Sequence, residues 1–175
     1  MNEDSDETLM LAYVQGDATA FETLYGRYRR PLYGYFLRHV SDEPTANDLY
    51  QGCWEKVIKA RQRYRERSPF RAWLFHIAHN HLVDHYRAHR STAPLPDSLA
   101  EATEREPPAT LDEADRMSAF RTALASLPPE QREALSLRLD AGLSQAEVAQ
   151  VTGVGKETVK SRLRYGIQKL REVLP

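Results

Sequence analysis

The sequence contains a single cysteine, Cys53, among 175 residues, so no disulfide can form within the chain. A reducing compartment is therefore the expected environment. No apolar run approaches the ~20 residues that a membrane-spanning helix needs. The first 30 residues are acidic and lack the apolar core of a secretory signal peptide. These absences predict a cytoplasmic protein with no membrane segment.

Enzyme motifs are missing as well. The sequence has no glycine-rich phosphate loop, and Cys53 has no histidine at the spacing of a known nucleophile motif. Ser144 immediately precedes a helical pattern, where serine acts as a cap rather than as a nucleophile. We therefore expect no catalytic residue, no cofactor and no enzymatic activity.

Alternation of apolar and polar residues, the signature of a strand, is absent, and apolar residues recur at helical spacing. The pattern predicts an all-α protein. Pro31 and Gly34 make a kink or break plausible in the second helix, and Ser68 is a candidate cap for the fourth. The expected helices cover about 6–15, 18–39, 44–63, 69–90, 110–126, 129–141, 145–152 and 156–173.

The segment from Ser91 to Ala109 separates these helices into two groups. It contains four prolines among acidic and small residues, a composition typical of an extended linker. We expect two small helical domains, residues 1–90 and 112–175, joined by a flexible acidic linker over 91–111.

Charge is segregated along the chain, although the total is only −1. Residues 1–20 carry −5, residues 21–90 carry +6, residues 91–115 carry −6 and residues 116–175 carry +4. Two basic modules on either side of an acidic connector indicate a protein that binds an anionic partner such as nucleic acid.

The segment 143–170 reads as a capped short helix, a glycine turn and a longer amphipathic helix. This order is typical of a helix-turn-helix, whose second helix enters the DNA major groove. One face of the second helix is apolar and is expected to pack on the core; it comprises Val159, Leu163, Gly166, Ile167 and Leu170. The other face offers groups for base edges and phosphates, namely Glu157, Lys160, Ser161, Arg162, Arg164 and Tyr165.

Residues 56–90 combine nine basic residues with interleaved aromatic side chains. This combination suits single-stranded nucleic acid, because bases stack on aromatic rings while basic groups neutralise the backbone. Tyr64, at the edge of a basic loop, is the expected stacking residue, whereas Phe70 and Trp73 are expected to pack in the core. A polar stripe follows on the next helix, formed by His76, Asn80 and Arg87 with Asp84 at its border.

Two alternatives remain open at this point. The first is a helix-turn-helix regulator that binds duplex DNA by itself. The second is a metal site on the helix over 69–90, since His81, His85 and His89 recur at intervals of four residues. No acid or cysteine completes that set, so we expect no bound metal.

Several motifs together resemble extracytoplasmic-function sigma factors. Asp48-Leu49-Tyr50-Gln51, the segments 70–74 and 77–80, and Asp84-His85 are similar to regions 2.2 to 2.4 of that family. Leu127-Pro128 and the segments 143–149 and 158–163 are similar to its region 4. The resemblance runs in order from about residue 9 to residue 171, with a linker where the family has one.

The resemblance implies a function and partners. The first domain would bind the clamp helices in the largest subunit of core RNA polymerase through Asp48, Gln51, Trp54 and Glu55. It would also recognise and melt the promoter −10 element with Tyr64, Arg65, Arg67, Ser68, His76, Asn80, Asp84 and Arg87. The second domain would read the duplex −35 element through Glu157, Lys160, Ser161, Arg162, Arg164 and Tyr165. A separate anti-sigma protein would regulate the chain.

Overall fold

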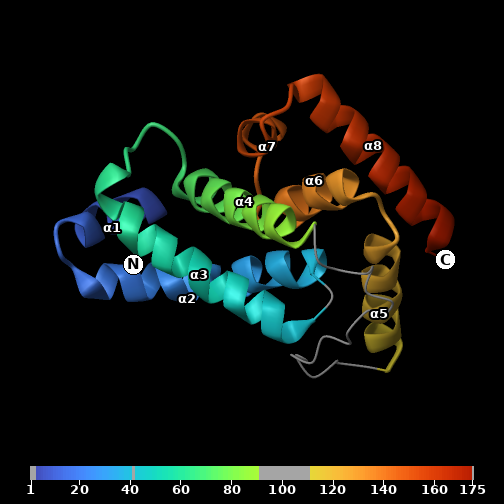
Figure 1. The fold of residues 1–175 in the computed structure, drawn as a ribbon, viewed down its shortest axis with the longest axis horizontal. Coiled ribbons are helices and arrows are strands. Elements are labelled where there is room, and N and C mark those ends of the chain that lie inside the picture. The colour runs from blue at the N-terminus through green and yellow to red at the C-terminus, as the bar shows by residue number, and fades with distance from the viewer. Residues whose placement is uncertain (1–2, 41, 91–110, 175) are drawn as a thin grey trace.

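The computed structural model describes residues 3–40, 42–90 and 111–174, and these residues form eight α-helices and one short 3-10 helix without any strand (Figure 1). This confirms the predicted all-α class. The elements are α1 (Asp6–Val14), α2 (Ala18–His39), α3 (Glu43–Ala60), η1 (Arg61–Arg63), α4 (Phe70–His89), α5 (Leu111–Ala125), α6 (Pro129–Leu139), α7 (Gln145–Thr152) and α8 (Lys156–Val173).

The helices form two packed groups. In the N-terminal half (residues 3–90), α2 packs on α1 and α3, and α4 packs on α3. In the C-terminal half (residues 111–174), α8 packs on α6 and α7. The predicted linker lies almost entirely outside the described residues.

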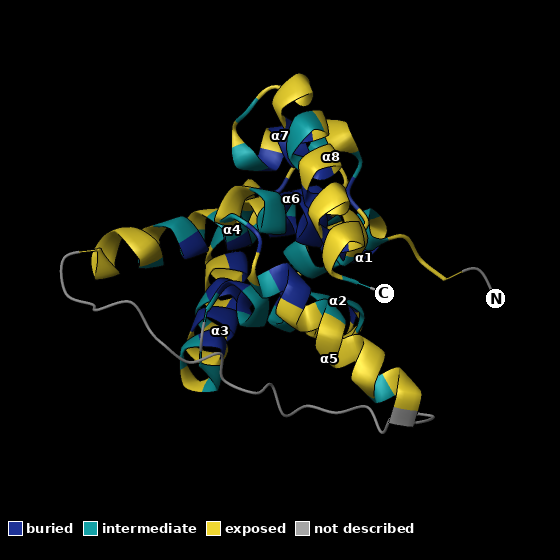
Figure 2. Ribbon diagram, turned by 90° about the vertical axis from the view of Figure 1, so that its right-hand side faces the viewer, coloured by how far each residue is buried: buried dark blue, intermediate teal, exposed yellow. Residues whose placement is uncertain are grey.

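The two halves also contact each other. Helix α4 packs against α7, and α2 packs against α5 and α6. The buried side chains accordingly form one cluster that runs through both halves. Figure 2 shows buried residues where the elements meet, whereas most of α5 is exposed.

Helix α2 runs as a single helix through Pro31, where the sequence suggested a kink or break. Proline removes one backbone hydrogen bond from a helix interior. Leu24 and Leu32, on either side of the proline, are both fully buried. We attribute the continuity of the helix to this tertiary packing.

The cap of α4 differs from the expected one. Helix α4 begins at Phe70 and no side chain of its own N-cap residue bonds to it. Instead, the backbone N–H of Phe70 donates to a carboxylate oxygen of Glu7 at 2.8 Å. The carboxylate of Glu7 in α1 thus accepts from a backbone N–H at the start of α4, where the sequence predicted the Ser68 side chain as the cap. Thr110 and Glu113 have the spacing of a capping box at the start of α5, but Thr110 lies outside the described residues.

None of the helices in the described residues combines the length and the apolar character that crossing a bilayer requires.

Candidate functional site

Interactions between residues close in sequence define the ends of α7 and the turn that leads to α8. The Ser144 hydroxyl accepts from the backbone N–H of Glu147 at 3.1 Å, and the Glu147 carboxylate accepts from the N–H of Ser144 at 3.3 Å. The predicted cap at Ser144 is confirmed, and Glu147 completes it as a capping box. Gly153 ends α7 in the left-handed conformation with φ of 73°, which glycine adopts without steric cost.

Helix α8 packs through one face, as the pattern predicted. Val159, Leu163, Gly166 and Leu170 are buried. The backbone at Gly166 approaches α6 so closely that a Cβ there would lie 2.8 Å from Leu135 Cδ1. A larger residue at position 166 would clash with Leu135, so the close packing of α8 on α6 depends on glycine there.

The opposite face of α8 is available to a ligand. Lys160 and Arg164 are exposed, and Ser161 and Arg162 are partly so. Glu157 and Tyr165 are exposed on the same helix. The Arg164 guanidinium lies 5.0 Å from the centre of the Tyr165 ring, within the distance of a cation–π contact.

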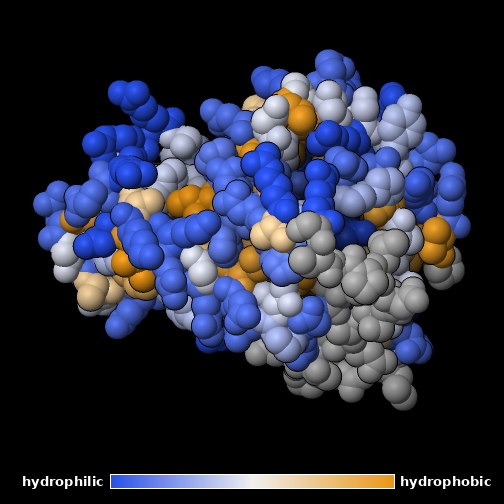
Figure 3. All heavy atoms as spheres, viewed as in Figure 1, coloured by the Kyte–Doolittle hydropathy of each residue, from blue (hydrophilic) through white to orange (hydrophobic). Residues whose placement is uncertain are grey.

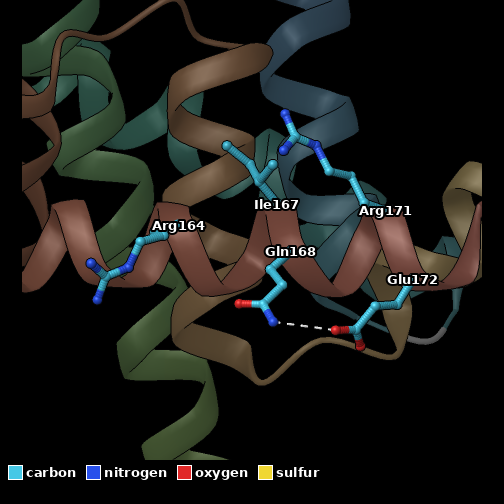
Figure 4. Close-up of a pocket in the computed structure, with 5 residues that line it drawn as sticks. All are labelled: Arg164, Ile167, Gln168, Arg171 and Glu172. Carbon is cyan, nitrogen blue, oxygen red and sulfur yellow. Dashed lines mark hydrogen bonds between the residues drawn. The ribbon is translucent and has the colours of Figure 1, made fainter.

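A shallow groove runs along the last turns of α8 (Figure 4). It is lined by Arg164, Ile167, Gln168, Arg171 and Glu172, and Gln168 donates to Glu172 at 3.3 Å. Ile167 was expected in the core face but is 40% exposed. The expectation was wrong because Ile167 lies at the border of the apolar face, where the helices packed on α8 leave it partly uncovered.

In the N-terminal half, the predicted base-stacking residue Tyr64 is buried. Its side chain is 2% exposed and packs edge-on against Phe70 and Trp73, with ring centres 6.2 and 5.2 Å away. Burial raises the pKa of Tyr64 to about 12. Stacking on a DNA base stays a prediction, but this ring would first have to leave the core.

The other residues predicted to read the single strand are exposed or partly exposed. Arg65 and Arg67 are exposed in the loop before α4 and Ser68 is partly so. His76, Asn80, Asp84 and Arg87 are exposed along α4. Asn80 Nδ2 lies 3.2 Å from His76 Nε2, and Lys56 of α3 lies 3.8 Å from Asp84. Figure 3 shows the molecule in the same view as Figure 1, and hydrophilic side chains cover most of the described part of this face.

Part of this surface faces the other half of the molecule. Ser68, Trp73 and His76 line one side of a half-open pocket of about 200 Å³, and Gln150 and Val151 of α7 form its other wall. Trp73 packs against the core, as expected, but it is only partly buried and also lines this pocket.

The predicted polymerase-binding residues lie on α3. Asp48, Gln51 and Glu55 are exposed. Trp54 is 5% exposed and packs with its ring centre 5.1 Å from that of Tyr25 and 5.7 Å from that of Phe21. Three of the four residues are thus accessible to a partner, whereas Trp54 packs α3 against α2.

The histidines of α4 have local partners. The ring centres of His85 and His89 lie 4.2 Å apart with the ring planes tilted by 35°, and His89 Nδ1 lies 2.8 Å from the backbone oxygen of His85. His81 lies at the α3 contact, because a Cβ on Gly52 would come within 2.7 Å of its ring. Among the residues that the structure describes, no three His, Cys, Asp or Glu side chains group as metal ligands would.

Sequence reasoning missed the contact between the halves. Glu133 of α6 accepts hydrogen bonds from Tyr35 of α2 and pairs with His79 of α4. Arg38 pairs with Asp140, and Arg71 with Glu147. These partners are separated by 54 to 102 residues, so no spacing rule for a single helix could identify them.

The chain was compared with known families. Residues 24–92 match the family model of Sigma-70 region 2, and residues 123–172 match that of Sigma-70, region 4. The first match covers α3 and α4 with most of α2, and the second covers the helix-turn-helix.

Similar proteins carry names of the same kind. The ECF RNA polymerase sigma factor BldN of Streptomyces coelicolor is 33% identical over 98% of this chain and 68% of its own length. The RNA polymerase sigma factor CarQ of Myxococcus xanthus is 31% identical over 94% of this chain and 95% of its own. Among solved structures, CnrH in complex with the cytosolic domain of CnrY aligns with a TM-score of 0.71 and 25% identity over 97% of this chain and 96% of that one.

Proposed function

The chain belongs to the sigma-70 family as an extracytoplasmic-function RNA polymerase sigma factor, and from this we propose how its two halves divide promoter recognition. The C-terminal half reads the duplex −35 element with α8. The N-terminal half binds core polymerase through α3 and reads the melted −10 element with α4 and the loop before it. The observation that carries the proposal is the helix-turn-helix, whose second helix buries its apolar face and leaves its polar face exposed.

On α8 we assign different roles to neighbouring side chains. Lys160, Ser161 and Arg164 contact base edges, because their donors and acceptors project from the exposed face. Arg162 is nearer the packed face and contacts phosphate, which positions the helix without reading sequence. Glu157 and Tyr165 flank this surface, and Tyr165 supports the Arg164 guanidinium.

In the N-terminal half, the loop and α4 share the −10 element. Arg65 and Arg67 neutralise the backbone while a base enters the region of Ser68 and His76. Asn80, Asp84 and Arg87 continue the contact along α4. Because Tyr64 is buried, Trp73 in the pocket is the better stacking surface. Unstacking a base costs a few kcal/mol, which stacking and phosphate contacts can offset.

Core polymerase binds through the exposed side of α3. Asp48, Gln51 and Glu55 present two carboxylates and an amide to the clamp helices of its largest subunit, and the buried Trp54 holds α3 in place. This division of roles corresponds to domains over 1–90 and 112–175 with a linker over 91–111. The proposal includes no catalytic activity of the chain itself.

Regulation by a second protein is part of the proposal. The solved structure of CnrH contains the cytosolic domain of CnrY, and the sigma factor RpoE of Bartonella quintana, 22% identical and similar in fold, was solved with the anti-sigma factor NepR. We expect an anti-sigma protein to bind this chain in the same way. Because sigma factors act with RNA polymerase, we propose that this chain acts in the cytoplasm.

Run-off transcription with core polymerase on a genomic library tests the proposal. The chain should direct initiation at a set of sites that share −35 and −10 sequences. Asp48→Ala with Gln51→Ala should reduce initiation at all of them, because polymerase binding is lost before promoters are distinguished. If the chain binds duplex promoters tightly without polymerase and supports no initiation, it is a regulator of the other kind.

A further inference from the structure

Helix α1 contacts both ends of the loop between η1 and α4, residues 64–69, which we call the capture loop. Beyond one end of the loop, the backbone N–H of Phe70 donates to the carboxylate of Glu7, in the first turn of α1, at 2.8 Å. Before the other end, Gln62 Nε2 donates to the backbone oxygen of Val14, the last residue of α1, at 3.5 Å. One short helix therefore holds both ends of the capture loop.

Helix α1 is itself fixed to α2 by polar and apolar contacts. The Tyr28 hydroxyl and the Arg27 guanidinium both donate to the Asp6 carboxylate, the guanidinium at 2.8 Å. Burial and the hydrogen bond to Asp6 raise the pKa of Tyr28, so its hydroxyl keeps the proton that it donates. Leu9 and Met10 of α1 are buried in the core. Helix α1 is thus a fixed element against which a loop can be positioned.

Glu7 connects α1 to the start of α4. The N-cap residue of α4 is Pro69, whose side chain makes no cap hydrogen bond. The first backbone N–H groups of a helix need acceptors from outside the helix, and a carboxylate there also interacts favourably with the helix dipole. Glu7 supplies that acceptor from a different helix, 63 residues away in the sequence. The position at which α4 begins is therefore tied to α1.

The side chains that depend on this junction are those to which we assign capture of the −10 strand. Arg65 and Arg67 are exposed on the capture loop, and Ser68 at its end lines the pocket beside α4. Trp73 lines the same pocket from the first turn of α4, where its backbone N–H donates to the oxygen of Pro69. The direction of the Trp73 ring therefore follows the start of the helix that Glu7 holds.

We propose that α1 holds the capture loop in the arrangement that receives the −10 strand, with Glu7 as the positioning residue, an inference that rests on the function proposed above for the loop and α4. Helix α1 precedes residues 24–92, the segment that matches Sigma-70 region 2. Glu7 acts through the loop and touches no DNA. A loop ordered before the strand arrives loses less conformational freedom on binding, so the affinity for the strand is higher.

Substitutions at Glu7 test the proposal in full-length chains assembled with core polymerase. Each complex is titrated with the single-stranded non-template −10 oligonucleotide of a promoter found by run-off sequencing. Glu7→Ala removes the acceptor and should weaken binding about tenfold, because only the fraction of molecules with the loop in place binds the strand. Glu7→Gln keeps an oxygen at the same position and should lose only about threefold. Glu22→Ala, which removes an exposed acid from α2, is the matched control and should bind as wild type does.

Two further measurements separate positioning of the loop from general stability of the N-terminal half. The affinity of each chain for core polymerase should be unchanged in Glu7→Ala, because the proposed polymerase contacts lie on α3, away from the capture loop. Backbone hydrogen exchange should become faster at residues 64–73 in this variant and stay as in wild type across α3. Loss of polymerase affinity together with faster exchange in α3 would show that Glu7 stabilises the whole half, and would overturn the positioning role.

Tyr28→Phe tests the other attachment of α1 and replaces Glu7→Ala where circular dichroism shows that variant to be unfolded. It keeps the ring that packs edge-on against Phe70, with centres 5.4 Å apart, and removes the hydroxyl that donates to Asp6. Binding of the −10 oligonucleotide should weaken about threefold. Affinities equal to wild type in both variants would overturn the role of α1, even while run-off transcription succeeds. Failure of the wild-type complex to bind the oligonucleotide would instead overturn the proposed function.

Discussion

The cores of the two halves differ in composition: aromatic side chains are frequent in the N-terminal half, and aliphatic side chains predominate in the C-terminal half. Fourteen of the 16 aromatic residues precede residue 91, and the C-terminal half has only Phe120 and Tyr165. The buried residues of the C-terminal half are mainly leucine, valine and alanine. Both halves bury polar atoms as well: His39 and the hydroxyls of Tyr50 and Tyr64 in the N-terminal half, and the Ser136 hydroxyl in the C-terminal half.

This contrast explains where the halves touch. A small aliphatic unit buries a low fraction of its surface and gains from further contact. Acidic side chains in and beside its helices α6 and α7 pair with Arg38, Arg71 and His79 of the other half. The two proposed DNA-binding surfaces also differ in exposure. Helix α7 lies against part of the strand-reading surface on α4, whereas the duplex-reading face of α8 is exposed.

Removing an aromatic ring should have the largest effect. Phe75 is fully buried on α4 and packs edge-on against Tyr35 with ring centres 5.7 Å apart. Phe75→Ala should lower the free energy of unfolding by about 3–5 kcal/mol through lost burial and the cavity left behind. Urea denaturation measures the change, with the exposed Met117→Ala as control. Equal losses in both variants would contradict the assigned core.

The buried histidine His39 predicts that the stability of the folded chain depends on pH. Burial lowers the pKa of His39 to about 4. Its Nδ1 lies 2.6 Å from the Tyr35 carbonyl, while its Nε2 finds no partner among the described residues. Protonation would place a second N–H in the core without an acceptor. The unfolded chain accepts the proton near pH ~6.5, so the folded state loses stability below that pH.

The loss should reach about 3 kcal/mol between pH 7 and pH 4, after subtraction of the profile of His39→Leu, which lacks the titrating group. The facing groups Glu133, Arg132 and Arg38 are present in both proteins, and so are Tyr35 and Tyr86. Denaturant midpoints across the pH range give the difference. Parallel profiles would mean that His39 is not held neutral in the core.

The duplex-reading surface should respond differently at adjacent arginines. Arg164→Ala should reduce discrimination among −35 sequences by about 1–3 kcal/mol, because it removes donors to a base edge. Arg162→Ala should weaken all sequences alike and lower the salt slope by about one unit. Competition binding with the polymerase complex at several salt concentrations separates the two. A uniform loss in both variants would show that the recognition face is misassigned.

The smallest effect is expected at the cap of α7. Ser144→Ala removes the hydroxyl that accepts from Glu147 and should destabilise the chain by about 1 kcal/mol. Ser144→Asp retains an acceptor and is the rescue variant. Thermal unfolding monitors both, and a Ser144→Asp chain no more stable than Ser144→Ala would argue against capping as the cause.

Sequence reasoning was most successful where partners lie within one helical turn. The capping box at Ser144, the turn glycine Gly153 and the packed face of α8 all depend on spacings of two to four residues. Such interactions form whenever the local chain is helical, so their pattern is legible in a single sequence. Exposure was harder to predict, as Tyr64 and Ile167 show, because an amphipathic pattern does not specify which ring or side chain a neighbouring helix will cover.

By itself, the sequence determined the helices, the two basic modules and the family to which the chain belongs. Only the tertiary structure decided that Glu7 caps α4, that Trp73 rather than Tyr64 reaches a pocket, and that Glu133 lies between Tyr35 and His79. These contacts join residues 54 to 98 positions apart. Their partners are selected by how whole helices pack, since burial and shape, not spacing, determine which charged groups meet.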